Sequence, residues 1–232
     1  MREDFGAAEY GRATSNFEMS MRLISLNVGM PRQVAVPHGA VLTSIFKEPV
    51  EDRRAVRRHN IEGDRQSDLT VHGGPNKAIY CYPSEHYAYW RDQLPGMDLP
   101  NGAFGENLTT EGLLETAVRI GDRFRAGTAL LQVTQPRMPC FKLGIRFGRA
   151  DMVKRFWKSG RSGIYFSIIE EGEIGVGDSI EQVADGPENV SVNDVVRLHS
   201  GDEESDELFE RAMRAPLSGS WKQDILERRA GR

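Results

Sequence analysis

The sequence predicts a mainly β fold with peripheral helices, followed by a small unit of three helices. Two observations predict the β part: short runs rich in β-branched and aromatic residues, and the Gly, Pro, Asn and Asp clusters that separate them. A third predicts the helical end, because past residue 185 three segments follow serine start signals and carry apolar side chains at helical spacing. Many short strands favour a barrel or folded sheet over alternating βαβ units.

The first convincing strand is Arg22–Val28. Residues 1–20 before it are polar and lack periodicity, which predicts a disordered N-terminal tail. Four more strands are predicted, at Val41–Phe46, Ala78–Tyr82, Thr128–Thr134 and Ile164–Ile169. These strands place one β-rich domain over residues 21–185.

Two helices are predicted to interrupt the strands. Ser84 is a plausible N-cap for a helix at Glu85–Leu94, which Pro95 and Gly96 end. The second helix is predicted at Ala150–Lys158. Both carry a one-sided apolar stripe that predicts core packing, made of Tyr87, Trp90, Leu94, Met152, Val153, Phe156 and Trp157.

The three C-terminal helices define an extension over residues 186–232. They are predicted at Val192–His199, Asp206–Arg214 and Trp221–Arg229, after Ser191, Ser205 and Ser220. An extension of roughly 40 residues is too small to be stable alone, so it should dock on the β domain. Its candidate core is Val195, Leu198, Leu208, Phe209, Ala212, Trp221, Ile225 and Leu226.

Composition excludes several classes of protein. The 232 residues are 39% hydrophobic and 28% charged, as in an ordinary globular protein. No run is long and apolar enough for a membrane helix, and the N-terminus has no signal-peptide character. The two cysteines, Cys81 and Cys140, form no disulfide framework and suggest a reducing, cytoplasmic location.

Charge is unevenly distributed along the chain. The net charge is −4, yet residues 137–161 hold eight Lys and Arg against one Asp, whereas residues 170–210 hold 14 acids against one Arg. A basic stretch on a net acidic chain predicts a local anion site. Interleaved aromatic residues leave nucleic-acid binding as an alternative use of this stretch, although the core needs most of those aromatics.

The most unusual local sequence surrounds Cys140, which follows Pro136 and Pro139 at the end of a predicted strand. Neither proline can donate a ladder hydrogen bond, so the backbone leaves the sheet near the thiol. Basic neighbours, Arg137 and Lys142 among them, favour the thiolate, the form that binds metals and attacks electrophiles. The alternative interpretation is a small buried thiol in a turn.

Two further segments hold candidate binding residues. In residues 68–78, the pair Gly73 and Gly74 would let the backbone approach a phosphate or heterocycle, while His72 and Lys77 add a donor and a charge. A Gly-Gly-Pro turn is also a common tight connection. In residues 104–108, Glu106 and Asn107 offer a carboxylate and an amide for a ring edge, or for satisfying a turn.

Other chemistries find less support. A zinc site would have to use His72, Cys81, His86 and Cys140, whose spacing is irregular and lacks a paired short-range motif. There is no G-x-S-x-G elbow for a serine hydrolase. A P-loop and a dinucleotide glycine fingerprint are absent as well.

Four blocks in matched order carry a family resemblance: DLTVHGGPNKAIYCYPSEHYAYW, FGENLTTEGL, IGDRFRAGTALLQVTQPRMPCFKLGIRFG and SGIYFSIIEEGEIGVGD. Together with the three-helix end, they resemble MOSC-domain proteins of the YiiM type over about Met21 to Arg229. Cys81 departs from the motif, which has no thiol there. The resemblance implies a MOSC β-barrel that binds molybdenum cofactor, a phosphorylated pterin dithiolene.

The resemblance also implies a site and a reaction. Cys140 would be the protein ligand to molybdenum, and the enzyme would reduce N-hydroxylated bases such as 6-hydroxylaminopurine to the amine, independently of pyridoxal phosphate. A separate electron-donor protein is implied, with no nucleic-acid or membrane partner. Chemistry and block membership then assign cofactor or substrate contacts to His72, Gly73, Gly74, Lys77, Glu106, Asn107, Gln135, Arg137, Lys142 and Arg146. The alternative function is a non-catalytic carrier of the cofactor, or of a persulfide, on Cys140.

Overall fold

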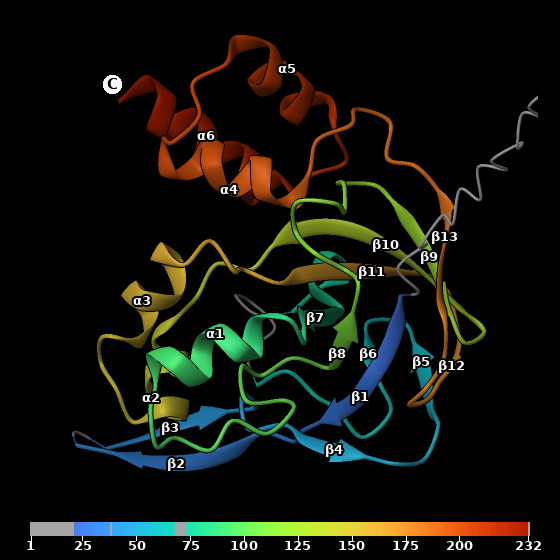
Figure 1. Ribbon diagram of the computed structural model, residues 1–232, viewed down its shortest axis with the longest axis vertical. Coiled ribbons are helices and arrows are strands. Elements are labelled where there is room, and N and C mark those ends of the chain that lie inside the picture. Colours follow the sequence, from blue (N-terminus) through green and yellow to red (C-terminus); the bar gives the residue numbers. More distant parts are fainter. Residues whose placement is uncertain (1–20, 38, 68–72, 232) are drawn as a thin grey trace, which may run out of the picture.

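A computed structural model describes residues 21–37, 39–67 and 73–231 of the chain (Figure 1). The predicted tail at residues 1–20 and the candidate His72 lie outside the described residues.

An eight-stranded sheet forms the body of the molecule. Its strand order is β13-β9-β10-β11-β7-β8-β1-β4, and all neighbours are antiparallel except the parallel pair β7 and β8. The strands are β1 (Arg22–Val28), β4 (Glu48–Val50), β7 (Ile79–Pro83), β8 (Leu108–Glu111), β9 (Arg123–Ala126), β10 (Ala129–Pro136), β11 (Ile164–Glu170) and β13 (Ile180–Ala184).

The sheet curves strongly, but its strands do not pair as one closed barrel, because β13 and β4 are the unpaired ends of the ladder. The start of β1 instead meets the chain beside β13. Arg22 forms an isolated bridge with Ser179, and Leu23 N donates to Asp178 O at 3.0 Å. The predicted β-rich body is confirmed, whereas a continuous closed barrel is not detected.

Two smaller sheets flank the main one. The strands β5 (Arg54–Arg57), β6 (Asn60–Ile61) and β12 (Gly172–Ile174) form a three-stranded sheet. A hairpin of β2 (Arg32–Val36) and β3 (Gly39–Thr43) replaces the strand predicted at Val41–Phe46. That prediction was wrong at its C-terminal end, because residues after Thr43 leave the strand and turn toward the pocket described below.

Three helices pack on the outer face of β7 (Figure 1). Two were predicted and lie at α1 (His86–Gln93) and α3 (Met152–Lys158), although Ser84 does not cap α1. The third, α2 (Phe141–Phe147), was missed; Gly144 lies in its middle and Gly148 directly after it, and glycine lowers helix propensity. Gly148 in fact ends α2 in a left-handed conformation with φ 61°. A short 3₁₀ turn, η1 (Pro75–Lys77), precedes β7.

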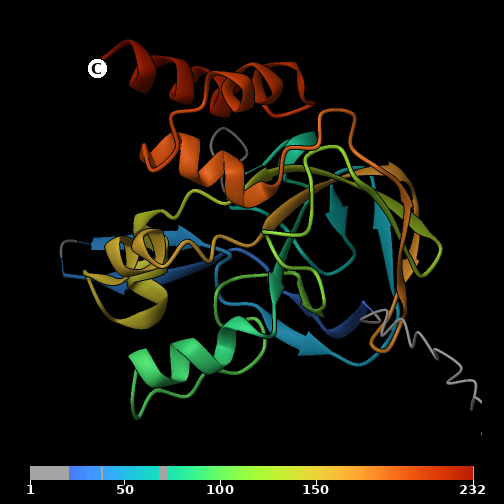
Figure 2. The same cartoon turned by 45° about the horizontal axis from the view of Figure 1, so that its top comes forward.

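The C-terminal unit contains the three expected helices, α4 (Val192–Ser200), α5 (Asp206–Arg214) and α6 (Gly219–Ala230). Ser191 and Asp194 form the predicted capping box on α4. Ser205 caps α5, but α6 begins earlier than predicted, at Gly219. Figure 2 shows the unit covering one end of the sheet, and its apolar residues join the sheet's interior core. Leu226 is the exception, since its side chain is exposed.

Strand β7 separates two hydrophobic cores. Ile79 and Cys81 belong to the sheet interior, whereas Tyr80 and Tyr82 face a second core under α1, α2 and α3. This alternation follows from the two-residue period of a strand. In the second core, Phe104 packs against the ring of Tyr82 with centroids 4.6 Å apart. This aromatic core supports α2, the helix that begins directly after Cys140.

Candidate functional site

Cys140 lies where strand β10 ends and helix α2 begins. Pro136 is the last residue of β10, and Cys140 is the N-cap of α2 with extended backbone angles, φ −120° and ψ 171°. Its carbonyl accepts a hydrogen bond from Leu143 N at 3.0 Å, so the backbone is fixed while the side chain stays half-buried. The predicted departure of the chain from the sheet near Cys140 is confirmed.

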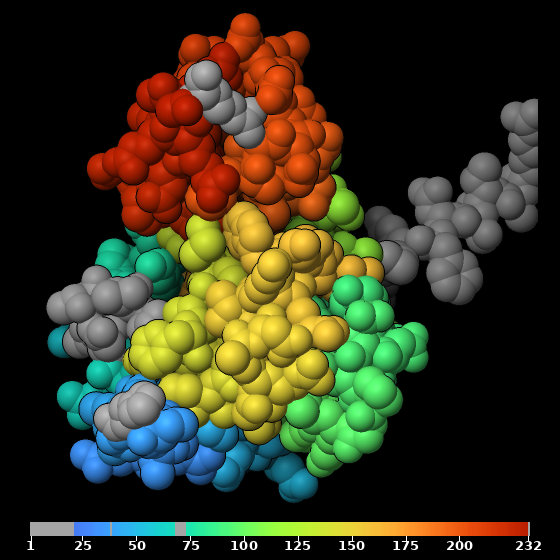
Figure 3. All heavy atoms as spheres, turned by 90° about the vertical axis from the view of Figure 1, so that its left-hand side faces the viewer, coloured from blue at the N-terminus to red at the C-terminus, as the bar shows by residue number. Residues whose placement is uncertain are grey.

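Cys140 lines a pocket that holds about 560 Å³ of empty space, counting space open to solvent. The pocket is built from segments far apart in the sequence: the end of β3 and the chain after it, residues 64–67, η1 and β7, residues 105–107, the β10–α2 junction and β11. Figure 3 shows one face of the molecule on which α2 and α3, in yellow, lie between the blue β2–β3 hairpin and the C-terminal helices.

The pocket wall is cationic. Four basic side chains line it against a single carboxylate, that of Asp64. The four are Lys47, Lys77, Arg137 and Lys142. A cavity with this balance attracts anions, and partial burial strengthens that attraction because water screens it less.

Arg137 is the most deeply placed of these cations, with only 6% of its surface exposed. Its guanidinium lies 4.6 Å from the ring centroid of Tyr80 and donates a hydrogen bond to the carbonyl of Phe104. Among the described residues, no carboxylate forms an ion pair with it. Burying a cation without an ionic partner costs desolvation free energy, which an anionic ligand beside it would offset.

The lysines differ in their partners. Lys142, in the first turn of α2, donates to Ser67 Oγ at 2.9 Å. Lys77 is the last residue of η1; burial lowers the pKa of its ammonium group, and Asp224 of α6 opposes that shift. Lys47 pairs with Asp64, whose side chain is almost completely buried.

Asp64 and Asn107 connect the pocket floor to the strands. Asp64 accepts hydrogen bonds from Gly29 N at 2.8 Å and from Asn107 Nδ2 at 2.9 Å, in addition to its ion pair with Lys47. Asn107 Oδ1 accepts from Tyr80 N at 3.1 Å. Asn107 lines the pocket, but its amide is engaged with protein groups. The Lys47–Asp64 pair was missed, because no local motif marks either residue.

Two pocket residues carry polar atoms without a partner. Ser44 Oγ and Gln66 Oε1 are buried and have no hydrogen bond within the described part of the chain. Buried polar atoms are normally satisfied, so such atoms at a pocket wall fit a polar ligand. Together with the unpaired Arg137, they make the wall suitable for a polar, anionic group such as a phosphorylated pterin.

Other candidate residues do not line the pocket. Glu106 is completely buried and accepts hydrogen bonds from Tyr87 Oη, Thr109 Oγ1 and the backbone of Gly102 and Phe104. Burial raises the pKa of its carboxyl group, and the Tyr87 hydrogen bond opposes that shift. Its contacts hold the 102–106 turn, so the expected contact with a ring edge or substrate is not found at the pocket wall.

The remaining candidates lie outside the pocket wall. Gln135 is buried on β10, with Oε1 unpartnered among the described residues. Arg146, on α2, lies over the Phe46 ring at 5.3 Å. Gly73 and Gly74 precede η1, where Gly74 has φ +91°, a backbone conformation that favours glycine. These four residues are not part of the pocket wall.

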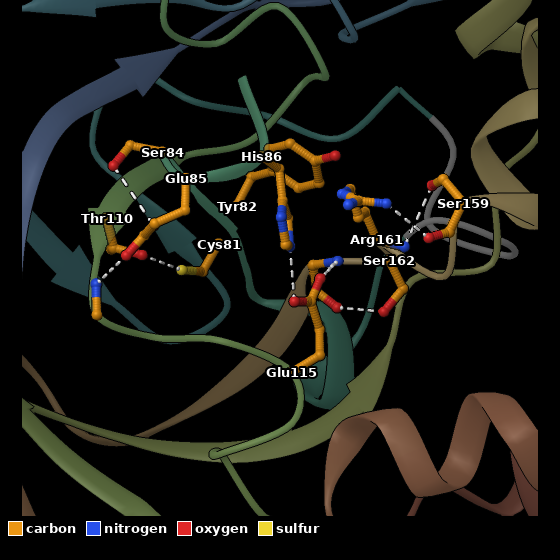
Figure 4. A network of polar contacts seen from close by, with 12 residues as sticks. Cys81, Tyr82, Ser84, Glu85, His86, Thr110, Glu115, Ser159, Arg161 and Ser162 are labelled. Carbon is orange, nitrogen blue, oxygen red and sulfur yellow. Dashed lines mark hydrogen bonds and ion pairs between the residues drawn. The ribbon is translucent and has the colours of Figure 1, made fainter. Parts of the chain in front are cut away.

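Cys81 and His86 belong to a different network, shown in Figure 4. Cys81 Sγ contacts Thr110 Oγ1 at 3.1 Å inside the protein, and burial raises the pKa of this thiol well above its ordinary range. His86 Nε2 contacts Glu115 at 2.7 Å, and Glu115 also accepts from Gly163 N at 2.7 Å. Within residues 21–37, 39–67 and 73–231, no group of three or more His, Cys, Asp and Glu side chains is arranged to hold a metal.

Comparisons with known proteins identify the family of the chain. A family model for the MOSC domain matches residues 68–181. Protein YiiM of Escherichia coli (strain K12) is 36% identical over 198 residues, which cover 84% of this chain and 88% of YiiM. The chain belongs to the MOSC-domain proteins of the YiiM type. YflK of Bacillus subtilis (strain 168) is 40% identical over 208 residues, which cover 89% of this chain and 94% of YflK.

Other MOSC relatives extend the comparison. The crystal structure of YiiM from Geobacillus stearothermophilus has a TM-score of 0.74 and 35% identity, covering 90% of this chain and 98% of that one. A protein of Gibberella moniliformis (strain M3125 / FGSC 7600) named reductase is 35% identical over 145 residues, which are 61% of this chain and 26% of that protein. No helix in the described part of this MOSC protein is long and apolar enough to cross a membrane.

Proposed function

We propose that this MOSC protein is a molybdenum-cofactor-dependent reductase that removes the hydroxyl group from N-hydroxylated bases such as 6-hydroxylaminopurine. The observation that carries the proposal is the half-exposed Cys140 thiol in the wall of a cationic pocket. A soft thiolate is a suitable ligand for molybdenum that two dithiolene sulfurs already hold, and the cationic wall suits the anionic cofactor. Membership of the MOSC family and a relative named reductase support a redox role.

Distinct groups of the pocket would hold the cofactor. Cys140 would ligate the metal, Arg137 and Lys142 would neutralise its anionic groups, and Ser44 and Gln66 would supply hydrogen bonds. When bound, the cofactor would supply the two electrons of the reduction. The protein contributes binding, orientation and charge.

We propose that the electrons come from another protein. The described residues contain no cysteine cluster for an iron–sulfur centre, because Cys81 and Cys140 are the chain's only cysteines. We therefore propose a separate electron-donor protein and a small-molecule substrate. Both cysteines are free thiols, which fits a reducing compartment, and we propose that this compartment is the cytoplasm.

The test measures metal and turnover in matched variants. Wild type, Cys140→Ser and Cys81→Ser are produced in a host that makes the cofactor, and molybdenum, zinc and fluorescent oxidised pterin are measured per chain. Reduction of 6-hydroxylaminopurine is then followed with a chemical reductant. We expect near-stoichiometric molybdenum and turnover in wild type and Cys81→Ser. In Cys140→Ser we expect turnover to fall more than about 100-fold while the fold is retained. Loss of a residue that only supports a metal ligand already lowers activity by about 10- to 100-fold, and loss of the ligand itself should lower it further.

Three other outcomes would contradict the proposal in different ways. Equal turnover in Cys140→Ser and wild type would remove Cys140 from the reaction. Stoichiometric cofactor without turnover would support a carrier of cofactor or persulfide instead. Zinc without pterin would overturn the molybdenum assignment.

A further inference from the structure

Tyr165 lines the same pocket as Cys140, the candidate metal ligand. No sequence pattern assigned a role to this tyrosine. It lies on β11, paired with Gln135 of β10 on one side and Tyr80 of β7 on the other. Its ring and the ring of Tyr80 have centroids 5.0 Å apart, and both tyrosines line the pocket together with Cys140. The central position of β11 in the sheet therefore holds the Tyr165 ring in a fixed place.

The hydroxyl groups of Tyr80 and Tyr82 have hydrogen-bond partners, whereas the hydroxyl group of Tyr165 has none among the described residues. Tyr80 Oη donates to Ser162 O at 2.9 Å, and Tyr82 Oη accepts from Trp90 Nε1 at 2.6 Å. Tyr165 Oη has no hydrogen-bond partner among the described residues. The oxygen is not among the fully buried polar atoms that lack a partner, so it keeps some accessible surface, and Tyr165 lines the pocket.

This oxygen is suited to donating rather than accepting a proton. Burial raises the pKa of Tyr165 and Arg137 opposes that shift, with the net direction upward. The group therefore stays a neutral O–H donor at physiological pH. A donor at a fixed place in a partly dehydrated pocket stabilises an oxygen on which negative charge develops.

We infer that Tyr165 Oη donates a hydrogen bond to the hydroxyl oxygen of an N-hydroxylated substrate while the N–O bond breaks. The inference rests on the proposed function. In the overall reaction R–NH–OH takes up two electrons and two protons and yields R–NH₂ and H₂O. The two electrons would come from the bound cofactor, to which an electron-donor protein would return them in two one-electron transfers, and the protons would come from solvent. Tyr165 keeps its own proton and stabilises the departing oxygen.

The test removes one oxygen atom. Tyr165→Phe is compared with wild type and with Tyr89→Phe, a matched control on α1 whose hydroxyl also has no hydrogen bond within the described chain and which does not line the pocket. All three proteins are loaded with cofactor, and kcat and KM are measured for 6-hydroxylaminopurine. The inhibition constant of adenine, which lacks the hydroxyl oxygen, is measured alongside.

We expect kcat of Tyr165→Phe to fall about 10- to 100-fold, as for loss of one preorganised donor, while KM changes by less than about threefold. The adenine inhibition constant, the molybdenum content and the Tyr89→Phe kinetics should match wild type. A Tyr165→Phe enzyme with wild-type kcat overturns the inference and leaves the proposed function intact. A loss of adenine binding equal to the loss in kcat also overturns it, because that result means general damage to the pocket. An inactive, fully loaded wild type overturns the proposed function and this inference with it.

Discussion

The two cysteines of this chain lie in opposite environments. Cys81 points from β7 into the apolar interior, where it is completely buried and contacts Thr110. Cys140 stands at the start of α2 in a cationic pocket and is half-exposed. Tyr80, the neighbour of Cys81, already faces the pocket, so a shift of one residue along a strand separates the two regions. The reactivity of each thiol therefore depends on the direction of its side chain, which the sequence alone does not reveal.

The largest expected difference is in thiol reactivity. In the native protein without cofactor, iodoacetamide should alkylate Cys140 at least about 100-fold faster than Cys81, because the reaction needs an accessible thiolate. Burial both blocks access to Cys81 and raises the pKa of its thiol. Peptide mass spectrometry of timed samples measures both rates in one experiment. Equal rates would mean that the interior opens readily and that the contrast between the two regions is false.

The sequence predicted much of this contrast, but not all of it. Local signals sufficed for β1, for α5 and for the turn at Cys140, since capping serines, prolines and strand periodicity act over a few residues. Helix α2 was missed because its glycines lower helix propensity, while packing against α3 and the aromatic core stabilises it.

The pocket was only partly predictable. Arg137, Lys142, Lys77 and Asn107, four of the candidates for contacts with a cofactor or substrate, lie in its wall. Lys47, Asp64 and Tyr165 come from other segments that tertiary folding brings to the pocket, and no spacing rule connects them. Glu106 holds a turn, one of the two roles that the sequence left open, because a buried carboxylate that holds a turn has the same local sequence as one that binds a ligand.

Arg137 has no ionic partner among the described residues, whereas the exposed Arg149 is paired with Asp151. Arg137→Met should weaken retention of the cofactor about tenfold, because a charge-assisted contact in a buried site is lost. The stability of the cofactor-free protein should change by less than about 1 kcal/mol, since the cost of an unpaired buried charge also disappears. Molybdenum per chain after dialysis measures the first effect. If Arg149→Met loses as much molybdenum, overall charge and not the pocket explains the binding.

A substitution at Cys81 should change the free energy of unfolding more than a substitution at Cys140. Cys81→Ser places a hydroxyl among apolar side chains and should lower the free energy of unfolding by about 1 to 3 kcal/mol. Cys140→Ser, at a half-exposed position, should change it by less than about 0.5 kcal/mol. Urea unfolding of both variants without cofactor provides the measurement. The reverse order of the two effects would contradict the assigned environments.

The smallest expected effect concerns His199, which lies between the rings of Trp157 and Trp221 with centroids 5.1 Å from each. Burial lowers its pKa, and Arg228 lowers it further. As the pH falls below about 6.5, the unfolded chain takes up this proton before the folded protein does, so stability falls.

The variant His199→Gln should therefore lose less stability than wild type between pH 7 and pH 5.5, by about 2 °C in Tm. The control variant is His59→Gln, which removes an exposed histidine outside this aromatic cluster. An unchanged pH slope in His199→Gln would show that this histidine is not held neutral by burial.

The central claim is that Cys140, and not Cys81, binds the metal. X-ray absorption at the molybdenum edge counts the sulfur atoms bound to the metal in the loaded protein. We predict three in wild type and in Cys81→Ser, two from the dithiolene and one from Cys140, and two in Cys140→Ser reconstituted with cofactor. Three sulfurs in Cys140→Ser, or only two in wild type, would contradict the account.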